Sequence, residues 1–182
     1  PTRRSSDLIL PGDTLHAYYN EYGSLALLAV LPGTSISHAN TFVYGIATSA
    51  NIPSEYKIVK NGAVIDPSGL KKYDVVTLDA ANRQALVSDT RVSGRYSEGG
   101  PTVSYPQEVK VYGNSFRISD SAAAFFKDMK LKDYITLLFD ADGNVAAAYP
   151  RSTVSADMQG IVTAIDESKA TVTLTNGITL RN

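Results

Sequence analysis

Cysteine is absent from the 182 residues of this sequence, which excludes disulfides, thiolate metal sites and cysteine nucleophiles. Neither sign of charge is in excess, because 17 basic and 18 acidic residues leave a net charge of −1. That balance predicts no nucleic-acid partner. The longest apolar run, Leu25–Leu31, is far shorter than the ~20 residues of a membrane-spanning helix, so we expect no membrane insertion.

Residues suited to catalysis are scarce. His16 and His38 are the only histidines, and neither has an obvious carboxylate or second ligand beside it, so we predict no histidine triad or zinc site. The stretch Ser54-Glu55-Tyr56-Lys57 fits the S-x-x-K pattern of penicillin-binding enzymes, but S-D-N and K-T-G are missing and chance explains the match. The sequence also has no phosphate-binding glycine loop and no G-x-S-x-G. We predict a protein that is not an enzyme and has no cofactor.

The segment from Asp140 through Asp142 to Asn144 has oxygen ligands spaced like the start of a calcium-binding loop. No glutamate follows at the closing position of such a loop, and we predict no helix on either side. The corresponding segment 20–24 lacks the pair of aspartates. We interpret both segments as hairpin turns and predict no metal site.

The first eight residues, P-T-R-R-S-S-D-L, are polar and unlike the remainder of the chain. Codon by codon they resemble the translated end of a widely used sequencing adapter, and a basic N-terminal arm is the alternative. On the adapter interpretation, the gene lies at the edge of an assembled contig and the natural N-terminus is missing. We exclude residues 1–8 from the fold argument.

Two collinear sets of matches indicate a repeat of about 115 to 120 residues. At an offset of 120, segments 13–15 and 23–26 match 133–135 and 143–146; at an offset of 115, segments 45–48 and 59–62 match 160–163 and 174–177. We predict the closing hairpin of one truncated repeat at 9–34, a complete repeat at 40–151 and the opening hairpin of another truncated repeat at 157–182. Side chains such as Leu25 and Leu174 should then lack their natural packing partners.

Alternating apolar and polar residues predict an all-β fold. The strongest signal is Asn61-Gly62 between segments 56–60 and 63–65, because this dipeptide accepts the positive φ angles of a type I′ hairpin. Further turns are predicted at 79–83, 113–115 and 140–144, with another strand at 91–96. One segment has helical spacing instead, with four apolar residues on one face: Ala122, Phe125, Phe126 and Met129. We predict a small antiparallel β-barrel-like domain with one short helix at its end.

Three predicted strands share a common motif, in which an Asp stands four residues after one apolar residue and two before another. The aspartates are Asp13, Asp74 and Asp133, and each can accept backbone N–H bonds in the turn before its strand.

A separate cluster of Tyr18, Tyr19 and Tyr22 is the candidate ligand-binding site, where a sugar ring could stack. The alternative is that these tyrosines simply fit a pleated sheet surface.

The order of strands and turns from about 40 to 182 resembles the repeated β domain of S-layer-homology surface proteins of Gram-positive bacteria. Five segments carry the resemblance: 73–77, 87–94, 109–113, 131–138 and 142–146. In that family the β domains accompany separate helical wall-anchoring modules, and none lies in this sequence. The resemblance implies an extracellular location on the cell surface or cell wall.

We therefore expect a non-catalytic structural or scaffold module, with neighbouring repeats of the same chain as its partners. Two alternatives stay open. One is a carbohydrate- or ligand-binding module that uses exposed tyrosines to bind cell-wall or surface glycans. The other is an accessory domain of a surface enzyme whose catalytic part is encoded outside this sequence.

Overall fold

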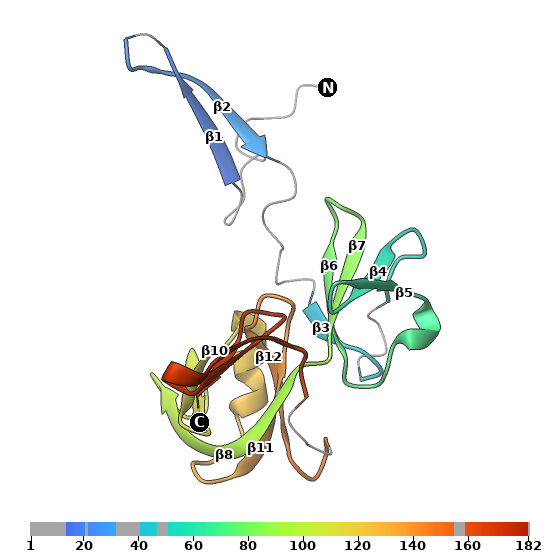
Figure 1. Ribbon diagram of the computed structural model, residues 1–182, viewed down its shortest axis with the longest axis vertical. Helices are drawn as coiled ribbons and strands as arrows, with labels where there is room; N and C mark the ends of the chain where they lie inside the picture. Colours follow the sequence, from blue (N-terminus) through green and yellow to red (C-terminus); the bar gives the residue numbers. More distant parts are fainter. Residues whose placement is uncertain (1–13, 21, 32–40, 47–50, 155–158, 182) are drawn as a thin grey trace.

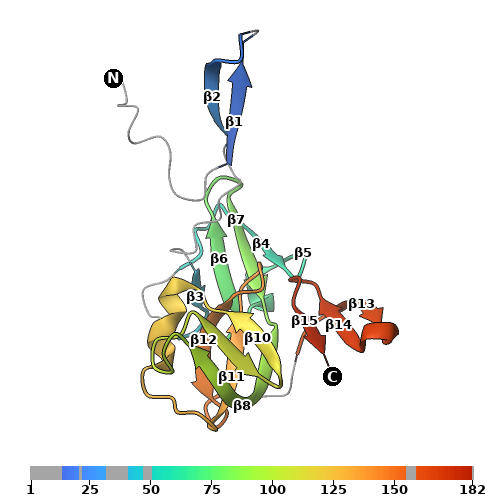
Figure 2. The same cartoon turned by 90° about the vertical axis from the view of Figure 1, so that its left-hand side faces the viewer.

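A computed structural model describes residues 14–20, 22–31, 41–46, 51–154 and 159–181. These residues form four β sheets (Figures 1 and 2). The first is the antiparallel hairpin of β1 (Thr14–Tyr19) and β2 (Leu25–Leu31). In both views this hairpin stands apart from the other sheets.

The second sheet has five strands in the order β3-β6-β7-β4-β5. Their bounds are β3 (Thr41–Val43), β4 (Lys57–Lys60), β5 (Ala63–Ile65), β6 (Val75–Asp79) and β7 (Gln84–Ser88). A 3₁₀ turn, η3 (Pro67–Gly69), lies between β5 and β6. Strands β4 and β7 run parallel, whereas the other pairs are antiparallel. The buried side chains of this sheet are those of Ile58, Val76, Ala85 and Val87.

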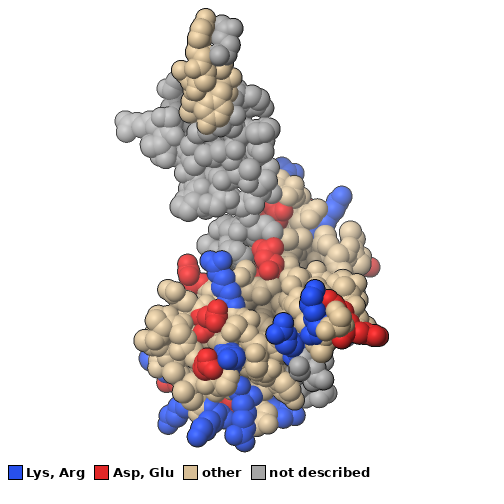
Figure 3. Space-filling model, turned by 60° about the vertical axis from the view of Figure 1, so that its left-hand side comes forward, with Lys and Arg blue, Asp and Glu red and all other residues tan. Residues whose placement is uncertain are grey.

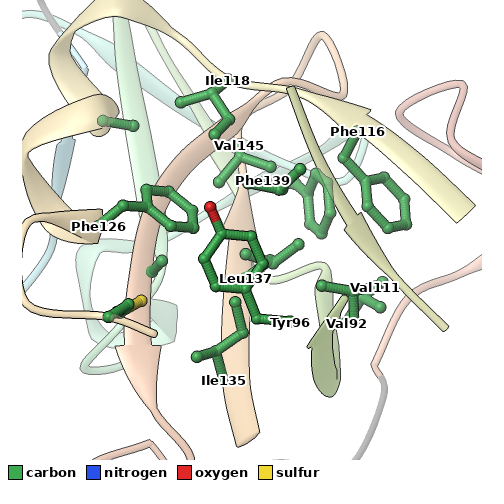
Figure 4. Close-up of a cluster of buried hydrophobic side chains, with 14 of the residues drawn as sticks. Val92, Tyr96, Val111, Phe116, Ile118, Phe126, Ile135, Leu137, Phe139 and Val145 are labelled. Carbon is green, nitrogen blue, oxygen red and sulfur yellow. The ribbon is translucent and has the colours of Figure 1, made fainter. Parts of the chain in front are cut away.

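The third sheet also has five strands, in the order β10-β9-β8-β11-β12. Their bounds are β8 (Arg91–Gly100), β9 (Glu108–Val111), β10 (Asn114–Arg117), β11 (Tyr134–Phe139) and β12 (Val145–Pro150). The first half of β8 pairs with β11 and its second half with β9. A helical segment, η4 (Asp120–Phe126), packs on β12. Tyr96, Phe126, Leu137 and Phe139 are buried in the core between these elements (Figure 4).

The fourth sheet, β13-β14-β15, packs against the third and completes its core. It consists of β13 (Val162–Asp166), β14 (Thr171–Leu174) and β15 (Thr179–Arg181), with the 3₁₀ turn η5 (Glu167–Lys169) between β13 and β14. Leu174 and Ile178 are only 5% and 6% exposed and belong to the same cluster as Phe139. The expectation that Leu174 lacks packing partners is therefore wrong.

The structure confirms the prediction of an all-β fold with one short helix. The barrel-like closure is not found, because no sheet of the described residues closes on itself, and the parallel β4–β7 pair departs from a wholly antiparallel arrangement. The predicted domain boundaries stay predictions; residues 32–40 and 155–158, where two of them fall, lie outside the described residues.

The helix is shorter than its apolar pattern suggested, and it is of the 3₁₀ type. Met129 is buried beyond its end, while Phe125 is 37% exposed and its ring packs edge-on against Tyr149. An Asp133 carboxylate oxygen accepts the Lys130 N–H at 2.8 Å. In a longer α-helix that N–H would instead bond to the Phe126 carbonyl, so the turn competes with the helix.

The predicted Asn61-Gly62 turn is confirmed, because both residues have positive φ angles of 49° and 86°, as a type I′ turn requires. The turn predicted at 113–115 lies one residue earlier. Its central residues are Tyr112 and Gly113, with φ angles of 56° and 73°, and Asn114 already pairs with Val111.

Candidate functional site

The tyrosine cluster lies at the turn end of the β1–β2 hairpin, where Tyr19 pairs with Leu25. Tyr19 and Tyr22 are 66% and 83% exposed. Tyr18 is in β1, but its side chain lies outside the described part of the structure. No contact between these tyrosines is found among the described side chains, so the predicted stacking platform stays untested.

The β1–β2 hairpin has the same strand register as the β11–β12 hairpin, shifted by 120 residues. Leu15 pairs with Val30 just as Ile135 pairs with Pro150. Both hairpins contain an irregularity at the same place: Tyr19 pairs with Leu25, and the residues 120 positions later in the chain, Phe139 and Val145, also pair.

The two turns also share one hydrogen-bond pattern. The Asn20 side-chain oxygen accepts the N–H groups of residues 22 and 24 at 3.0 and 2.9 Å. An Asp140 carboxylate oxygen accepts those of residues 142 and 144 at 3.0 and 2.8 Å. Gly23 and Gly143 have φ angles of 75° and 81°. The prediction that both segments are hairpin turns is confirmed.

This correspondence changes what the exposure of Tyr19 means. Its counterpart Phe139 is fully buried, and so is Val145, the counterpart of the 55% exposed Leu25. Tyr19 and Leu25 therefore occupy positions that point into a core in the other hairpin. Tyr22 corresponds to Asp142 in the other turn, and Asp142 is exposed. Unlike Tyr19, Tyr22 therefore occupies a position that is exposed to solvent in both hairpins.

The other candidate residues do not assemble into a site. Ser54 is exposed before β4, and Lys57 is the first residue of that strand. The side chain of His16 and the whole of His38 lie outside the described part of the chain. Among the described residues, no group of three or more His, Asp or Glu side chains is placed to hold a metal ion.

The aspartate motif before the strands is confirmed at two of its three positions. A carboxylate oxygen of Asp74 accepts the Lys71 N–H at 2.8 Å, as Asp133 does for Lys130. The preceding residues, Tyr73 and Lys132, both have positive φ angles, 72° and 78°. Asp13 lies outside the described residues.

A charged cluster that the sequence did not predict surrounds Asp74, which is fully buried. The Lys60 ammonium lies 2.8 Å from the Asp74 carboxylate and 3.3 Å from that of Asp89. Asn61 donates a hydrogen bond of 2.8 Å to Asp89. Burial alone would raise the pKa of Asp89, but the hydrogen bond from Asn61 and the charge and hydrogen bond of Lys60, with a contribution from the Arg91 charge, lower it. The cluster ties β4 to β6 and to the end of β7.

The surface carries both signs of charge. On the face drawn in Figure 3, acidic and basic side chains are interspersed. Two guanidinium groups, those of Arg95 and Arg151, lie over the ring of Tyr134 at 5.4 and 5.6 Å. No helix of the described residues is long and apolar enough to cross a bilayer.

Comparisons with protein-family models, with curated proteins and with solved structures find no match for this chain.

Proposed function

We propose that this chain is a non-catalytic structural module of an exported bacterial surface protein, built from β units that recur along the chain. One observation carries the proposal: the β1–β2 and β11–β12 hairpins have the same register, the same irregularity and the same turn hydrogen bonds at a constant offset of 120 residues. The surface location is supported by the resemblance of the strand and turn pattern to β domains of S-layer-homology proteins.

Contact between successive units would give such an array its stiffness, because stacked units are stabilised by their neighbours. The β14–β15 turn lies against the β11–β12 turn, where the Asn176 amide donates a hydrogen bond to the Asp140 carbonyl at 3.3 Å. On the proposed repeat, β13–β15 belongs to the next unit. This contact is then a joint between two units.

Exchanging the turns tests the recurrence. We expect a variant with the sequence of residues 20–24 in place of 140–144 to fold and to unfold in one cooperative transition, because Asn20 and Asp140 cap the same two N–H groups. The matched control is Asp140→Ala, which keeps the native turn but removes the cap. If the exchanged turn destabilised the protein more than Asp140→Ala does, the two hairpins would not be equivalent units.

Carbohydrate binding is the second candidate, and the exposure of Tyr22 favours it. A screen of the full chain against cell-wall and other glycans separates the two functions. A structural module should bind none of them. Binding that is lost in Tyr22→Ala, with an unchanged melting temperature, would establish the tyrosine site instead.

A further inference from the structure

Three charged side chains of the cluster around Asp74 meet at one end of the second sheet. Lys60 is the last residue of β4, Asp74 directly precedes β6, and Asp89 directly follows β7. Strands β4 and β6 lie on opposite sides of β7. An amine and a carboxylate that are 14 residues apart in the chain are therefore held in contact by two strands that do not pair with each other.

The amine and the two carboxylates are in direct contact in a largely buried place. The Lys60 Nζ atom lies 2.8 Å from Oδ2 of Asp74 and 3.3 Å from Oδ2 of Asp89. The side chains of Lys60, Asp74 and Asp89 are only 12%, 0% and 15% exposed. Groups that are fixed in contact in this way react with each other at a high effective concentration.

The two oxygens of the Asp74 carboxylate have different surroundings. Oδ2 accepts hydrogen bonds of 2.8 Å from the Lys60 ammonium and from the Lys71 backbone N–H. Oδ1 is buried and has no hydrogen-bond partner among the described residues, an uncommon and costly state for a carboxylate oxygen. Capping the turn does not require this burial, because Asp133 accepts the Lys130 N–H in the equivalent turn and is exposed.

We propose that Lys60 and Asp74 become joined by an intramolecular amide bond, with Asp89 as the proton-transfer group. Within the ion pair, one proton passes from the Lys60 ammonium to Oδ1 of Asp74. The neutral amine then attacks Cγ of the carboxylic acid, as lysine amines do in covalent catalysis. A bond forms between Nζ and Cγ, and the bond from Cγ to Oδ1 breaks. Oδ1 leaves as water with the proton it received and a second proton from the amine, so the reaction needs no oxidant, reductant or co-reactant.

The neighbouring groups have defined roles in this reaction. The Asp89 carboxylate takes the second proton from the attacking nitrogen and passes it to the departing oxygen, and the 2.8 Å hydrogen bond from Asn61 holds Asp89 in place. The Lys71 N–H stabilises the negative charge that develops on Oδ2, which becomes the amide oxygen. The product no longer contains the buried charge of Asp74 or its unpartnered oxygen.

The amide bond would fasten β4 to β6 across β7 and so close a covalent ring in the second sheet. This inference goes beyond the proposed structural function and does not depend on it.

Mass spectrometry of the full chain under denaturing conditions tests the proposal. We expect the native chain to be lighter than its sequence by the mass of one water. Trypsin should leave Lys60 uncut and release segments 58–71 and 73–83 as one cross-linked peptide. A mass equal to that of the sequence, with normal cleavage after Lys60, would show that the cluster is only an ion pair and would refute the proposal.

Variants assign the roles of the three side chains. Lys60→Arg keeps the positive charge but lacks the reactive amine, so it should have its full sequence mass. Asp74→Asn should still form the bond, with loss of ammonia in place of water, and its product should have the same mass as that of the native chain. Asp89→Asn should leave most of the chain without the cross-link, whereas the matched control Asp133→Asn should react like the native chain. Loss of water that persists in Lys60→Arg would refute the proposed bond, and complete cross-linking in Asp89→Asn would refute the role of Asp89.

Discussion

Replacing Gly143 by alanine should test the contact between the β11–β12 turn and the β14–β15 turn. Gly143 has a φ angle of 81°, a left-handed conformation that costs an alanine about 1–2 kcal/mol. A Cβ atom at this position would also lie 2.6 Å from the Asn176 carbonyl oxygen. Because that neighbour is backbone, it can yield only if the β14–β15 turn moves.

The magnitude comes from a comparison with Gly62. Its φ angle of 86° is almost the same, but a Cβ there would meet nothing within 4 Å. Gly62→Ala should therefore cost only the backbone term of about 1–2 kcal/mol. Gly143→Ala should cost a further ~1–3 kcal/mol, the usual range for forcing extra atoms into a packed site.

Urea denaturation of the two variants gives the difference in unfolding free energy, and hydrogen exchange shows where it arises. We expect Gly143→Ala to speed exchange in β14 and β15 selectively, since these strands must shift. Gly62→Ala should leave their exchange unchanged. Equal losses of stability in the two variants, with β14 and β15 exchanging as in the native chain, would show that the turns are not in contact.

Three further results are expected. The folded-state pKa of Asp89 lies below its unfolded pKa of about 3.9, so the ionised carboxylate stabilises the fold above that pH and this contribution is lost as pH falls through the folded-state pKa. The unfolding free energy should therefore fall less steeply with decreasing pH in Asp89→Asn than in the native chain. Identical curves would contradict this. Leu174→Ala should cost about 2–5 kcal/mol in urea denaturation, because Leu174 lies in the main core; a loss below ~1 kcal/mol would mean that β13–β15 does not complete that core. Asp142→Asn should change the melting temperature little, and added calcium should not raise it; calcium-dependent stabilisation that Asp142→Asn abolishes would contradict the turn interpretation.

The hairpins could be predicted from the sequence because their determinants are local. Alternation marks the strands, and a residue that tolerates positive φ marks each turn. Pairing between strands that are far apart in the chain has no such local signal. The parallel β4–β7 pair joins Ile58 to Ala85, and the alternation within each strand does not specify which strand will be its neighbour.

Strand β8 shows how a tertiary contact extends an element beyond its local pattern. The sequence predicted a strand only to residue 96, because Gly99 and Gly100 are poor strand formers. In the structure, β8 continues to Gly100. The Tyr96 hydroxyl donates to the Val103 carbonyl at 2.8 Å, and it occupies the space that a Cβ of residue 99 would need. Glycine permits this close approach.

The candidate sites were predictable only in part, for the same reason. The aspartate motif identified the turn at Asp74, but its ion partner Lys60 lies 14 residues earlier and no spacing rule connects them. A cavity between the third and fourth sheets is lined by residues from β8, from the β9–β10 turn and from the β13–β15 sheet. In the sequence these residues are separate fragments, and only the packing of the two sheets brings them together.

The two Asn-Gly dipeptides show that packing can also select the form of a turn. Asn61-Gly62 forms a two-residue loop in which Lys60 pairs with Ala63. At Asn176-Gly177, only Gly177 is left-handed, and the turn is longer, with Leu174 N–H bonded to the Ile178 carbonyl. The longer turn places Ile178 in the core and lets Asn176 reach the Asp140 carbonyl. The same form, with one left-handed glycine, occurs at Gly23 and Gly143. Both forms are compatible with Asn-Gly. The match at an offset of 115 residues therefore repeats the dipeptide but not the strand register beside it, whereas the two hairpins matched at an offset of 120 residues share the same register.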